Sequence, residues 1–389
     1  MSFLIRILLL LCATGAFAQE PPIVVGAVVS QTGALAALAE DYRKALLLWQ
    51  EELNAAGGLL GRRIDLRLRD DGSDAVRAGR AYRELIGEDK ADLLIGPFGS
   101  AATLMAGAEA ERARRVLING AGGSQTVHRS GTRYMFQTAI PNVAYGDGVV
   151  ELARSAGFSR VFILARNDLA SREMGQAARE AALRQGLKAA QLLLYSTASD
   201  EFSVQIDQAR AAGAEAWIAF GGLRDTAQMV RSLKAVDYAP RLFFARSAAD
   251  PKLIPLIGQD AEFSLGAKAY DPRFPTPGNE QFARAFEARW SVPPGATAAH
   301  GYAAGTVLAE AVRRAGSLGQ EELRAALAQL ETNTVLGGYK VDPDSGAQLA
   351  TKPAVVQILR GRPQVVWPEW LQTATREPYP PWGERRPLE

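Results

Sequence analysis

Apolar strands and amphipathic helices alternate along the first part of this chain. Residues 23–30 (IVVGAVVS) form a continuous, largely β-branched run, which predicts a buried strand. Apolar residues then recur at helical spacing within 42–56, and Gly57-Gly58 supplies a C-terminal stop signal. The elements expected in this first series are strands 23–30, 64–69, 91–95 and 115–119 and helices 42–56, 74–88 and 101–114.

The same alternation restarts near residue 143. Parallel doubly wound sheets have this repeated strand–helix order. The sequence therefore predicts an α/β fold with two doubly wound parallel-sheet lobes, joined near Gln137 to Asn142. The elements expected in the second series are helices 143–156, 172–185, 202–212 and 224–235 and strands 160–165, 190–195, 215–220 and 241–245.

A third stretch has helical patterns without strong strands between them, and a hairpin follows it. Helices that lack their own sheet must pack on an earlier one, so we expect the chain to cross between the lobes more than once. Residues 373–389 are rich in proline and charge, which indicates an extended or loosely ordered tail. The elements expected here are helices 279–290, 301–315 and 320–330 and strands 354–359 and 364–367.

The first residues form a separate targeting segment. Arg6 precedes an apolar run over 7–13, and Ala16-Phe17-Ala18 places small residues before a cut at Gln19, which predicts a signal peptide over 1–18. The run is too short for a membrane anchor, which needs roughly 20 apolar residues. A lipoprotein signal through Cys12 is disfavoured by the bulky Leu11 before it. We expect the mature protein in the periplasm of a Gram-negative cell.

Composition removes several classes of function. The formal net charge of the 389 residues is +2, and no basic block indicates nucleic acid or an anionic membrane as a partner. Cys12 is the single cysteine, so the mature chain has no disulfide, Cys-ligated metal or thiol nucleophile. Only His128 and His300 supply imidazoles, and no local motif suggests a metal site or a catalytic triad. We expect no cofactor.

Two loops of the first lobe follow strands whose carboxyl ends should meet at one edge, where ligands of open parallel sheets bind. The first is 30–35, which includes Thr32, and the second is 96–100 (GPFGS). Ser100 is expected to cap the helix that begins near Ala101. Free N–H groups and the helix dipole there make a carboxylate site, or the serine caps only its own helix.

A third loop and a group in the second lobe complete the candidate edge. Residues 119–125 (NGAGGSQ) carry three glycines in five positions, either as a tight turn or to expose backbone groups to a ligand. They do not form the GxGxxG motif of dinucleotide sites. In the second lobe, Arg246 directly follows an apolar strand. Arg246 is expected either to bind an anionic ligand or to form an ordinary ion pair.

Three other features have ordinary explanations. His128 lies in a polar loop and is expected to be solvated, while His300 opens a helix as a cap or a packing residue. Asp70-Asp71 resembles a metal pair, but no third ligand is evident, so a turn or a cap for helix 74–88 is favoured.

The order of motifs resembles type I periplasmic binding proteins, specifically the branched-chain amino-acid-binding family of ABC transporters. Leu53 to Gly61 (LNAAGGLLG) is similar to the family's I-N-x-x-G-G-I-x-G stretch, and 96–100 resembles its G-P-x-x-S loop. Residues 133–137 (RYMFQ) resemble its crossover segment, with Gln137 where Arg is common. The resemblance covers essentially the whole mature chain.

The resemblance implies two lobes joined by three hinge crossovers, near 137–142, 266–272 and 337–352. The expected division is 19–138 plus 271–338 for the N-terminal lobe, 139–270 plus 339–372 for the C-terminal lobe, and 373–389 for the tail.

The resemblance also implies the ligand site. Ser100 grips the ligand carboxylate, and the other residues carried over by similarity are Phe98, Gly99, Ala121, Gly123, Ser124, Ser171, Leu223 and Ser247. Gly123 stands where the family has a threonine, and Ser247 where it has the acid that pairs with the ligand ammonium. A buried ammonium without an acid costs several kcal/mol. A carboxylate that lacks the amine, aromatic or dicarboxylic, therefore suits Ser100 and Arg246 better than an amino acid does.

The expected function is solute binding for an ABC importer, by a monomer that closes on a small carboxylate and docks on permease subunits. A sensory role that presents the solute to a receptor is the alternative within binding. An exported hydrolase or dehydrogenase needs a GxSxG elbow or a GxGxxG loop, and neither occurs, so we expect no enzyme activity.

Overall fold

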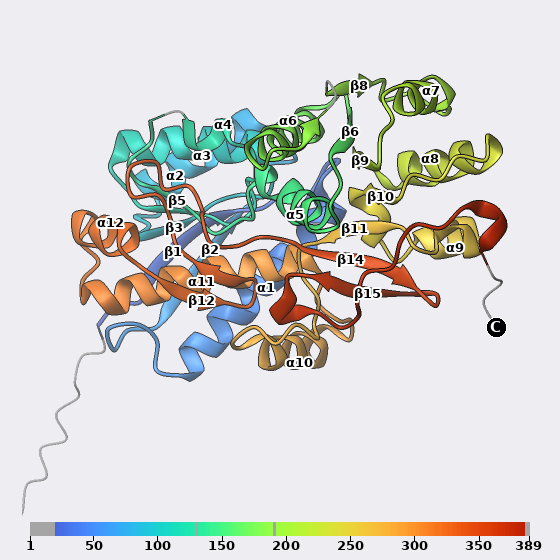
Figure 1. Ribbon diagram of the computed structural model, residues 1–389. Helices are drawn as coiled ribbons and strands as arrows, with labels where there is room; N and C mark the ends of the chain where they lie inside the picture. The colour runs from blue at the N-terminus through green and yellow to red at the C-terminus, as the bar shows by residue number, and fades with distance from the viewer. Residues whose placement is uncertain (1–19, 130, 190–191, 386–389) are drawn as a thin grey trace, which may run out of the picture.

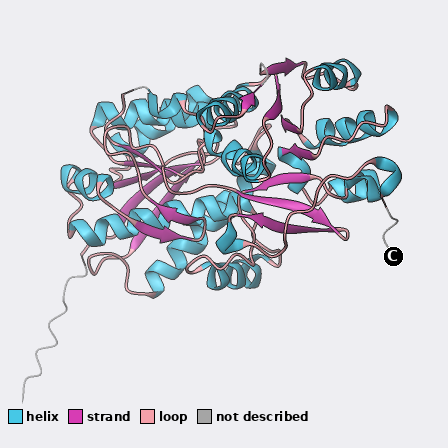
Figure 2. Ribbon diagram, in the orientation of Figure 1, coloured by secondary structure: helices cyan, strands magenta, loops and turns pink. Residues whose placement is uncertain are grey.

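Two main β-sheets organise the molecule, as the computed structural model shows (Figures 1 and 2). The structure describes residues 20–129, 131–189 and 192–385. The predicted leader at 1–18, with Cys12, lies outside the described residues. No helix within the described ranges combines the length and hydrophobicity needed to cross a bilayer.

The first sheet is wholly parallel, with strand order β2-β1-β3-β4-β5. Its strands are short and buried, and helices cover both faces. One face packs in a core with α1 and the other with α2 and α3. Its elements are β1 (Ile23–Val28), α1 (Ala36–Ala55), β2 (Ile64–Arg69), α2 (Ala75–Gly87), β3 (Leu93–Ile95), α3 (Ser100–Ala113), β4 (Leu117–Asn119), α4 (Thr126–Arg129) and β5 (Met135–Gln137).

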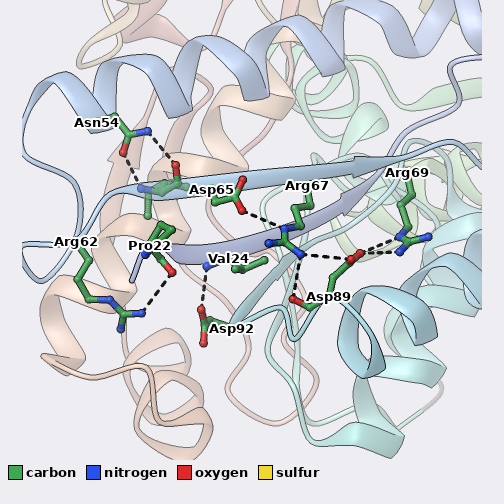
Figure 3. A network of polar contacts seen from close by, with 10 residues as sticks. Pro22, Val24, Asn54, Arg62, Asp65, Arg67, Arg69, Asp89 and Asp92 are labelled. Carbon is green, nitrogen blue, oxygen red and sulfur yellow. Dashed lines mark hydrogen bonds and ion pairs between the residues drawn. The ribbon is translucent and has the colours of Figure 1, made fainter. Parts of the chain in front are cut away.

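Strand β2 forms one edge of this sheet and carries charges on one face (Figure 3). Arg69 contacts both Glu84 and Asp89 at 2.8 Å, and Arg67 reaches Asp89 at 3.4 Å. Charged side chains on an edge strand discourage pairing with another chain. The half-exposed strand predicted at 64–69 is confirmed. Its alternating apolar and charged residues place the charged side chains on one face of the edge strand.

The second sheet is mixed, with the order β15-β14-β11-β10-β9-β6-β7 and β8 beside β6. Strands β6 to β11 run parallel, whereas β14 is antiparallel to both β11 and β15. The strands are β6 (Arg160–Arg166), β7 (Lys188–Ala189), β8 (Leu193–Tyr195), β9 (Ala216–Phe220), β10 (Leu242–Ala245), β11 (Leu265–Lys268), β14 (Ala354–Leu359) and β15 (Arg362–Trp367). The helices are η1 (Asn142–Gly146), α5 (Asp147–Ser155), α6 (Leu169–Arg184), α7 (Ser203–Ala211), α8 (Leu223–Ala235), η2 (Arg246–Ala249), α9 (Leu253–Ile257) and η3 (Gly258–Ala261).

The helices of the third stretch return to the first sheet, as their lack of strands predicts. Helix α11 lies so close to α1 that a Cβ added at Gly305 would sit 2.5 Å from the Trp49 ring. We call the parts built on the first and second sheets the first and second lobes. The elements of this stretch are α10 (Asn279–Trp290), α11 (Ala296–Ala315), α12 (Gln320–Ala328), β12 (Thr332–Thr334) and β13 (Gly337–Tyr339).

The chain crosses to the second lobe for the last time after Gln348. Val341 is buried in the core of the first sheet, and the Gln348 N–H donates to Gln137 Oε1 at 3.1 Å. Strand β14, which belongs to the second sheet, begins at Ala354. The chain therefore passes between the lobes near Gln137 to Asn142, after β11, and between Gln348 and Ala354.

The C-terminal segment, residues 373–385, is irregular but packed, so of the two predicted alternatives, extended or loosely ordered, only the loosely ordered one is wrong for these residues. Tyr379 is 3% exposed and stacks at 5.3 Å on Phe243 of β10. The Trp382 indole N–H donates to the Tyr238 carbonyl at 3.0 Å. The composition indicated disorder because of prolines and charges, yet Tyr379 and Trp382 supply apolar surface that anchors the segment. It includes η5 (Trp382–Glu384) and follows η4 (Glu369–Leu371).

Candidate functional site

The loop after β3 leads into α3 without a side-chain cap. The helix begins at Ser100 itself, and Gly99 is its N-cap residue, so the prediction that Ser100 caps the helix is wrong. Gly99 has a φ of 93°, a left-handed value that favours glycine, and a Cβ there would meet open space. The first N–H groups of α3 thus lack a capping side chain and sit beside an open position, where an anion is favoured.

The loop after β4 is held by a buried amide. Asn119 is fully buried, and its Oδ1 accepts from the Gly122 N–H at 2.7 Å while its Nδ2 donates to the Gly122 carbonyl at 2.9 Å. Gln137 Nε2 donates to the same carbonyl at 3.0 Å. A Cβ at Gly122 would come within 2.7 Å of Thr103 Oγ1, so the close packing requires glycine. The loop is a fixed scaffold.

These two loops bring most of the first-lobe candidates together. Phe98 and Ala121 form a parallel bridge, and the Ser124 N–H donates to Ser100 Oγ at 3.1 Å. Gly123 lies next to Ser124, and its carbonyl accepts from the Asn142 N–H at 2.7 Å. Phe98, Gly99, Ser100, Ala121, Gly123 and Ser124 therefore form one surface.

Thr32 is engaged elsewhere. Its hydroxyl donates to Asp70 Oδ2 at 2.6 Å, and its carbonyl accepts from the Ser73 hydroxyl at 2.7 Å. Burial raises the pKa of Asp70, but hydrogen bonds from Thr32, Gly72 and Gln31 outweigh it and lower the pKa to about 2. The aspartate pair predicted as a turn does form one, and the cap of α2 is Asp74.

The two histidines differ from their predicted settings. His128 is 6% exposed, so the prediction of a solvated side chain is wrong. Its Nδ1 lies 3.0 Å from the Ser345 carbonyl, which only accepts, so Nδ1 carries the proton and Nε2 accepts from the Asn119 amide. His300 lies inside α11 instead of opening it, and burial lowers its pKa to about 4.

Three second-lobe candidates are occupied by local structure. Asp168 accepts from both the N–H and the hydroxyl of Ser171, at 2.9 and 3.0 Å, and so caps α6. The Ser247 hydroxyl donates to the Gly221 carbonyl at 2.9 Å. Leu223 is the first residue of α8 and packs against an apolar cluster.

Arg246 lies in η2, directly after β10. Its Nε atom is buried and has no hydrogen-bond partner, and no acid forms an ion pair with it among the residues described. Burial raises the pKa of Tyr145 in η1, and the nearby Arg246 charge opposes that rise. The ion-pair alternative for Arg246 is therefore not found in the described part of the chain, and the guanidinium stays available to an anion.

Glu173 of α6 is a contact that sequence reasoning missed. Its Oε1 accepts from the Ser124 hydroxyl at 2.6 Å, and its Oε2 accepts from Asn142 Nδ2 at 2.9 Å. Both donors are neutral, and Glu173 has no ion pair within the described ranges. Glu173 thus joins the second lobe to the first-lobe surface at Ser124. No sequence signal marked it, because it reads as one of several charged positions along α6.

A charged network lies at the neighbouring strand ends of the second lobe. Arg166 Nε lies 2.7 Å from Asp168, and its Nη1 lies 3.8 Å from the buried Asp225. Burial raises the pKa of Asp168, but the bonds from Ser171 and Arg166 outweigh it and lower the pKa. Asp225 also accepts from the Tyr195 hydroxyl, and burial, followed by this carboxylate, raises the pKa of Tyr195.

No group of three or more His, Cys, Asp and Glu side chains is arranged to hold a metal ion in the portion of the chain described. The surface offers hydroxyls, backbone N–H groups, a guanidinium and a carboxylate. That donor set suits reversible binding of a small polar molecule.

Comparison with known proteins agrees with this geometry. A family profile described as "Periplasmic binding protein" matches residues 22–362. A curated relative from Pseudomonas aeruginosa, described as an amino acid binding protein, is 26% identical over 327 residues, which cover 82% of this chain and 86% of the relative.

Solved structures share the fold. A candidate branched-chain amino acid ABC transporter from Rhodospirillum rubrum has a TM-score of 0.80 at 24% identity, covering 88% of this chain and 99% of that one. A solute binding protein from Rhodopseudomonas palustris BisB5, in complex with 3,4-dihydroxy benzoic acid, has a TM-score of 0.71 at 19% identity, covering 89% and 95%. These matches confirm the predicted α/β fold.

Proposed function

This chain belongs to the periplasmic binding protein family, and on that premise we propose that it is the solute-binding component of an ABC importer. It encloses a small carboxylate-bearing molecule between its lobes and performs no catalysis. The observation that carries this proposal is the hydrogen bond between Ser124 and Glu173, because it joins the loop after β4 in the first lobe to helix α6 of the second lobe. A ligand placed there contacts both lobes, so its binding favours the closed arrangement.

The ligand carboxylate is assigned to the first N–H groups of α3, the Ser100 hydroxyl and Arg246. Ser100 Oγ accepts from Ser124, and no acceptor for its own proton is found among the described residues, so it can donate. Arg246 brings a positive charge whose Nε has no partner. A carboxylate would satisfy both groups and would stabilise the uncapped helix terminus.

Glu173 changes the ligand class that the sequence favoured. That argument set the amine aside because Ser247 stands at the family's acidic position. Glu173 supplies a carboxylate from another element, and only neutral groups contact it. One unpaired cation and one unpaired anion match a zwitterion, so an amino-acid-like ligand is favoured over a carboxylate without an amine. The amino acid binding relative and the dihydroxybenzoic acid complex support these two classes respectively.

The proposed moving bodies follow the division predicted from the sequence, 19–138 plus 271–338 and 139–270 plus 339–372, except that residues 339–348 join the first body, because Val341 lies in its core and the third crossing comes after Gln348. The leader at 1–18 delivers the protein to the periplasm, and the mature protein acts as a monomer.

Exposed apolar side chains support permease subunits as partners. Leu38 and Val76 on the first lobe and Leu169 and Val204 on the second are more than half exposed. Each lies in the first turn of a helix that follows a strand, at the edge where the proposed ligand binds. We propose that these four side chains contribute to one interaction face for the permease. Changing Leu38 and Leu169 to Asp should lower uptake while leaving ligand affinity unchanged.

Matched ligand pairs test the proposed function. Leucine is compared with 4-methylpentanoate, and phenylalanine with 3-phenylpropanoate, by thermal shift of the mature protein. A ligand at 100 times its Kd stabilises the native state by about 2.7 kcal/mol, which raises the Tm by several degrees. In at least one pair, the amino acid should raise the Tm by several degrees and by more than its partner without the amine does. If a broad panel of amino acids and organic acids leaves the Tm unmoved, the proposal is wrong.

A further inference from the structure

The C-terminal segment encloses a hollow on the second lobe, away from the proposed ligand site. The hollow has a volume of about 660 Å³. Its lining includes Phe158, just before β6, and Arg241, just before β10, together with Arg376 and Tyr379 of the segment. It therefore lies at the amino ends of strands whose carboxyl ends face the first lobe. The two sites are at opposite edges of one sheet.

The segment is tied down on both sides of this hollow. Glu377 exchanges two backbone hydrogen bonds with the Gln357 side chain, both at 2.8 Å, and the Tyr379 N–H donates to the Arg241 carbonyl at 3.2 Å. The Arg385 guanidinium lies 3.6 Å from the centroid of the Trp382 ring. Such contacts give a formed wall to the hollow.

Two guanidinium groups meet in the hollow over one aromatic ring. Arg241 lies 4.7 Å and Arg376 6.0 Å from the centroid of Phe158. Arg241, whose side chain is 65% exposed, forms an ion pair with Glu215 at 3.2 Å, whereas no acid pairs with Arg376 in the described ranges. Burial, and then the charge of Arg241, lower the pKa of Arg376. Glu377 and Glu384 also line the hollow, but both are exposed. The half-buried Arg376 guanidinium has no acidic partner in the described ranges and lies near a second cation, so a bound anion would offset its charge.

The family profile ends at residue 362, so the segment that builds this wall lies outside the matched residues.

We infer that the hollow is a second binding site, for a small anion with an apolar body. A carboxylate or phosphate head group lies between Arg241 and Arg376, where each guanidinium can donate two hydrogen bonds. The apolar body packs against Phe158 and the prolines that flank Tyr379. This inference does not depend on the proposed function.

Isothermal titration with phenyl phosphate and with benzoate tests the inference, and the tighter of the two identifies the head group. The titrations use the Arg246→Gln variant, which weakens binding between the lobes, and only the part of the signal that Arg376→Gln or Arg241→Gln removes is assigned to the hollow. We expect a Kd of about 1 mM, a common range for a partly exposed anion site. Inorganic phosphate lacks the body and benzyl alcohol lacks the head, and each should bind about tenfold more weakly.

Three further substitutions locate the site. Arg376→Gln and Arg241→Gln should each weaken binding about tenfold, as loss of one charge-assisted contact does. Arg362→Gln removes an exposed arginine of the same lobe and should change nothing. Thermal unfolding checks that each variant is folded. No binding up to about 10 mM, equal affinity after Arg376→Gln and Arg241→Gln, or an equal loss after Arg362→Gln would each overturn the inference.

Discussion

The strand-end loops of the two lobes differ in chemistry. On the first lobe they present neutral groups, the hydroxyls of Ser100 and Ser124 and backbone atoms around Gly123. Buried amides fix them, since Asn119 and Gln137 both bond to Gly122. On the second lobe the same region is charged.

The helices behind these loops differ in the same way. Helix α3 of the first lobe has no side-chain cap, whereas Asp168 caps α6 of the second lobe. An anion therefore finds a free helix N-terminus only in the first of these two helices. The second lobe offers instead an unpaired guanidinium on Arg246 and a carboxylate on Glu173.

This contrast assigns separate tasks to the lobes. The first lobe supplies preformed neutral donors that any small carboxylate can use. Under the proposed function, the second lobe selects the charges of the ligand, because its Arg246 and Glu173 lack charged partners among the described residues. Substitutions on the first lobe should change stability, and those on the second should change ligand choice.

Asn119→Ala should produce the largest effect. It leaves the Gly122 N–H without its acceptor in a fully buried loop, which costs about 3 kcal/mol of unfolding free energy. Urea denaturation measures the loss. Arg129→Ala, at an exposed position of the next turn, should stay within about 0.5 kcal/mol. Equal effects of the two changes would mean that Asn119 does not organise the loop.

Acid should destabilise the first lobe selectively. Both histidines of the chain, His128 and His300, belong to it, and burial lowers the pKa of each, that of His300 to about 4. An unfolded histidine titrates near 6.5, so the stabilisation is complete above about pH 6.5 and is lost as the pH falls toward the folded pKa.

We expect a loss of about 2 kcal/mol between about pH 7 and pH 4. Hydrogen exchange at the two pH values locates it, and His300→Gln should reduce it. Faster exchange in α6 to α8 than in α11 at low pH would contradict the assignment to the first lobe.

Much of the fold could be predicted from the sequence because long periodic segments carry their own signal. The helix expected at 279–290 and the strand at 354–359 have those bounds in the structure. Strand β11 was missed because its four residues show no period and its partners, β10 and β14, are distant in sequence. The packing of the tail was not predicted because burial of Tyr379 depends on a surface formed by β10.

The clustering of the first-lobe candidates was predicted for the same reason. Glycines and small residues after strands are local signals, and they marked the surface from Phe98 to Ser124. The roles of Ser171 and Ser247 depend on Asp168 and Gly221, which compete for their hydroxyls. The contact of Glu173 with Ser124 depends on how α6 packs against the first lobe, and no local sequence pattern indicates that packing.

Arg246→Gln should lower the affinity for the ligand without lowering the stability of the protein, as expected if the second lobe controls ligand choice. Loss of a charged hydrogen bond to the ligand carboxylate costs about 2 kcal/mol, or about a 30-fold rise in Kd. The free protein should be no less stable, because the change removes an enclosed cation that has no partner. Titration calorimetry and thermal unfolding measure both effects. Arg224→Gln, an exposed arginine at the start of α8, is the control, and a similar loss there would remove Arg246 from the site.

Glu173→Gln should have the smallest effect and the most specific one. Gln keeps an oxygen that accepts from Ser124 but loses the charge that faces the ligand amine. The affinity for an amino acid should fall about fivefold. The affinity for the matching acid without the amine should stay the same or rise, because the Glu173 charge that repels its carboxylate is removed. Glu180→Gln, on the exposed side of the same helix, should change neither. If both ligands weaken equally, Glu173 acts only to hold the lobes together, and the choice of charge does not reside on the second lobe.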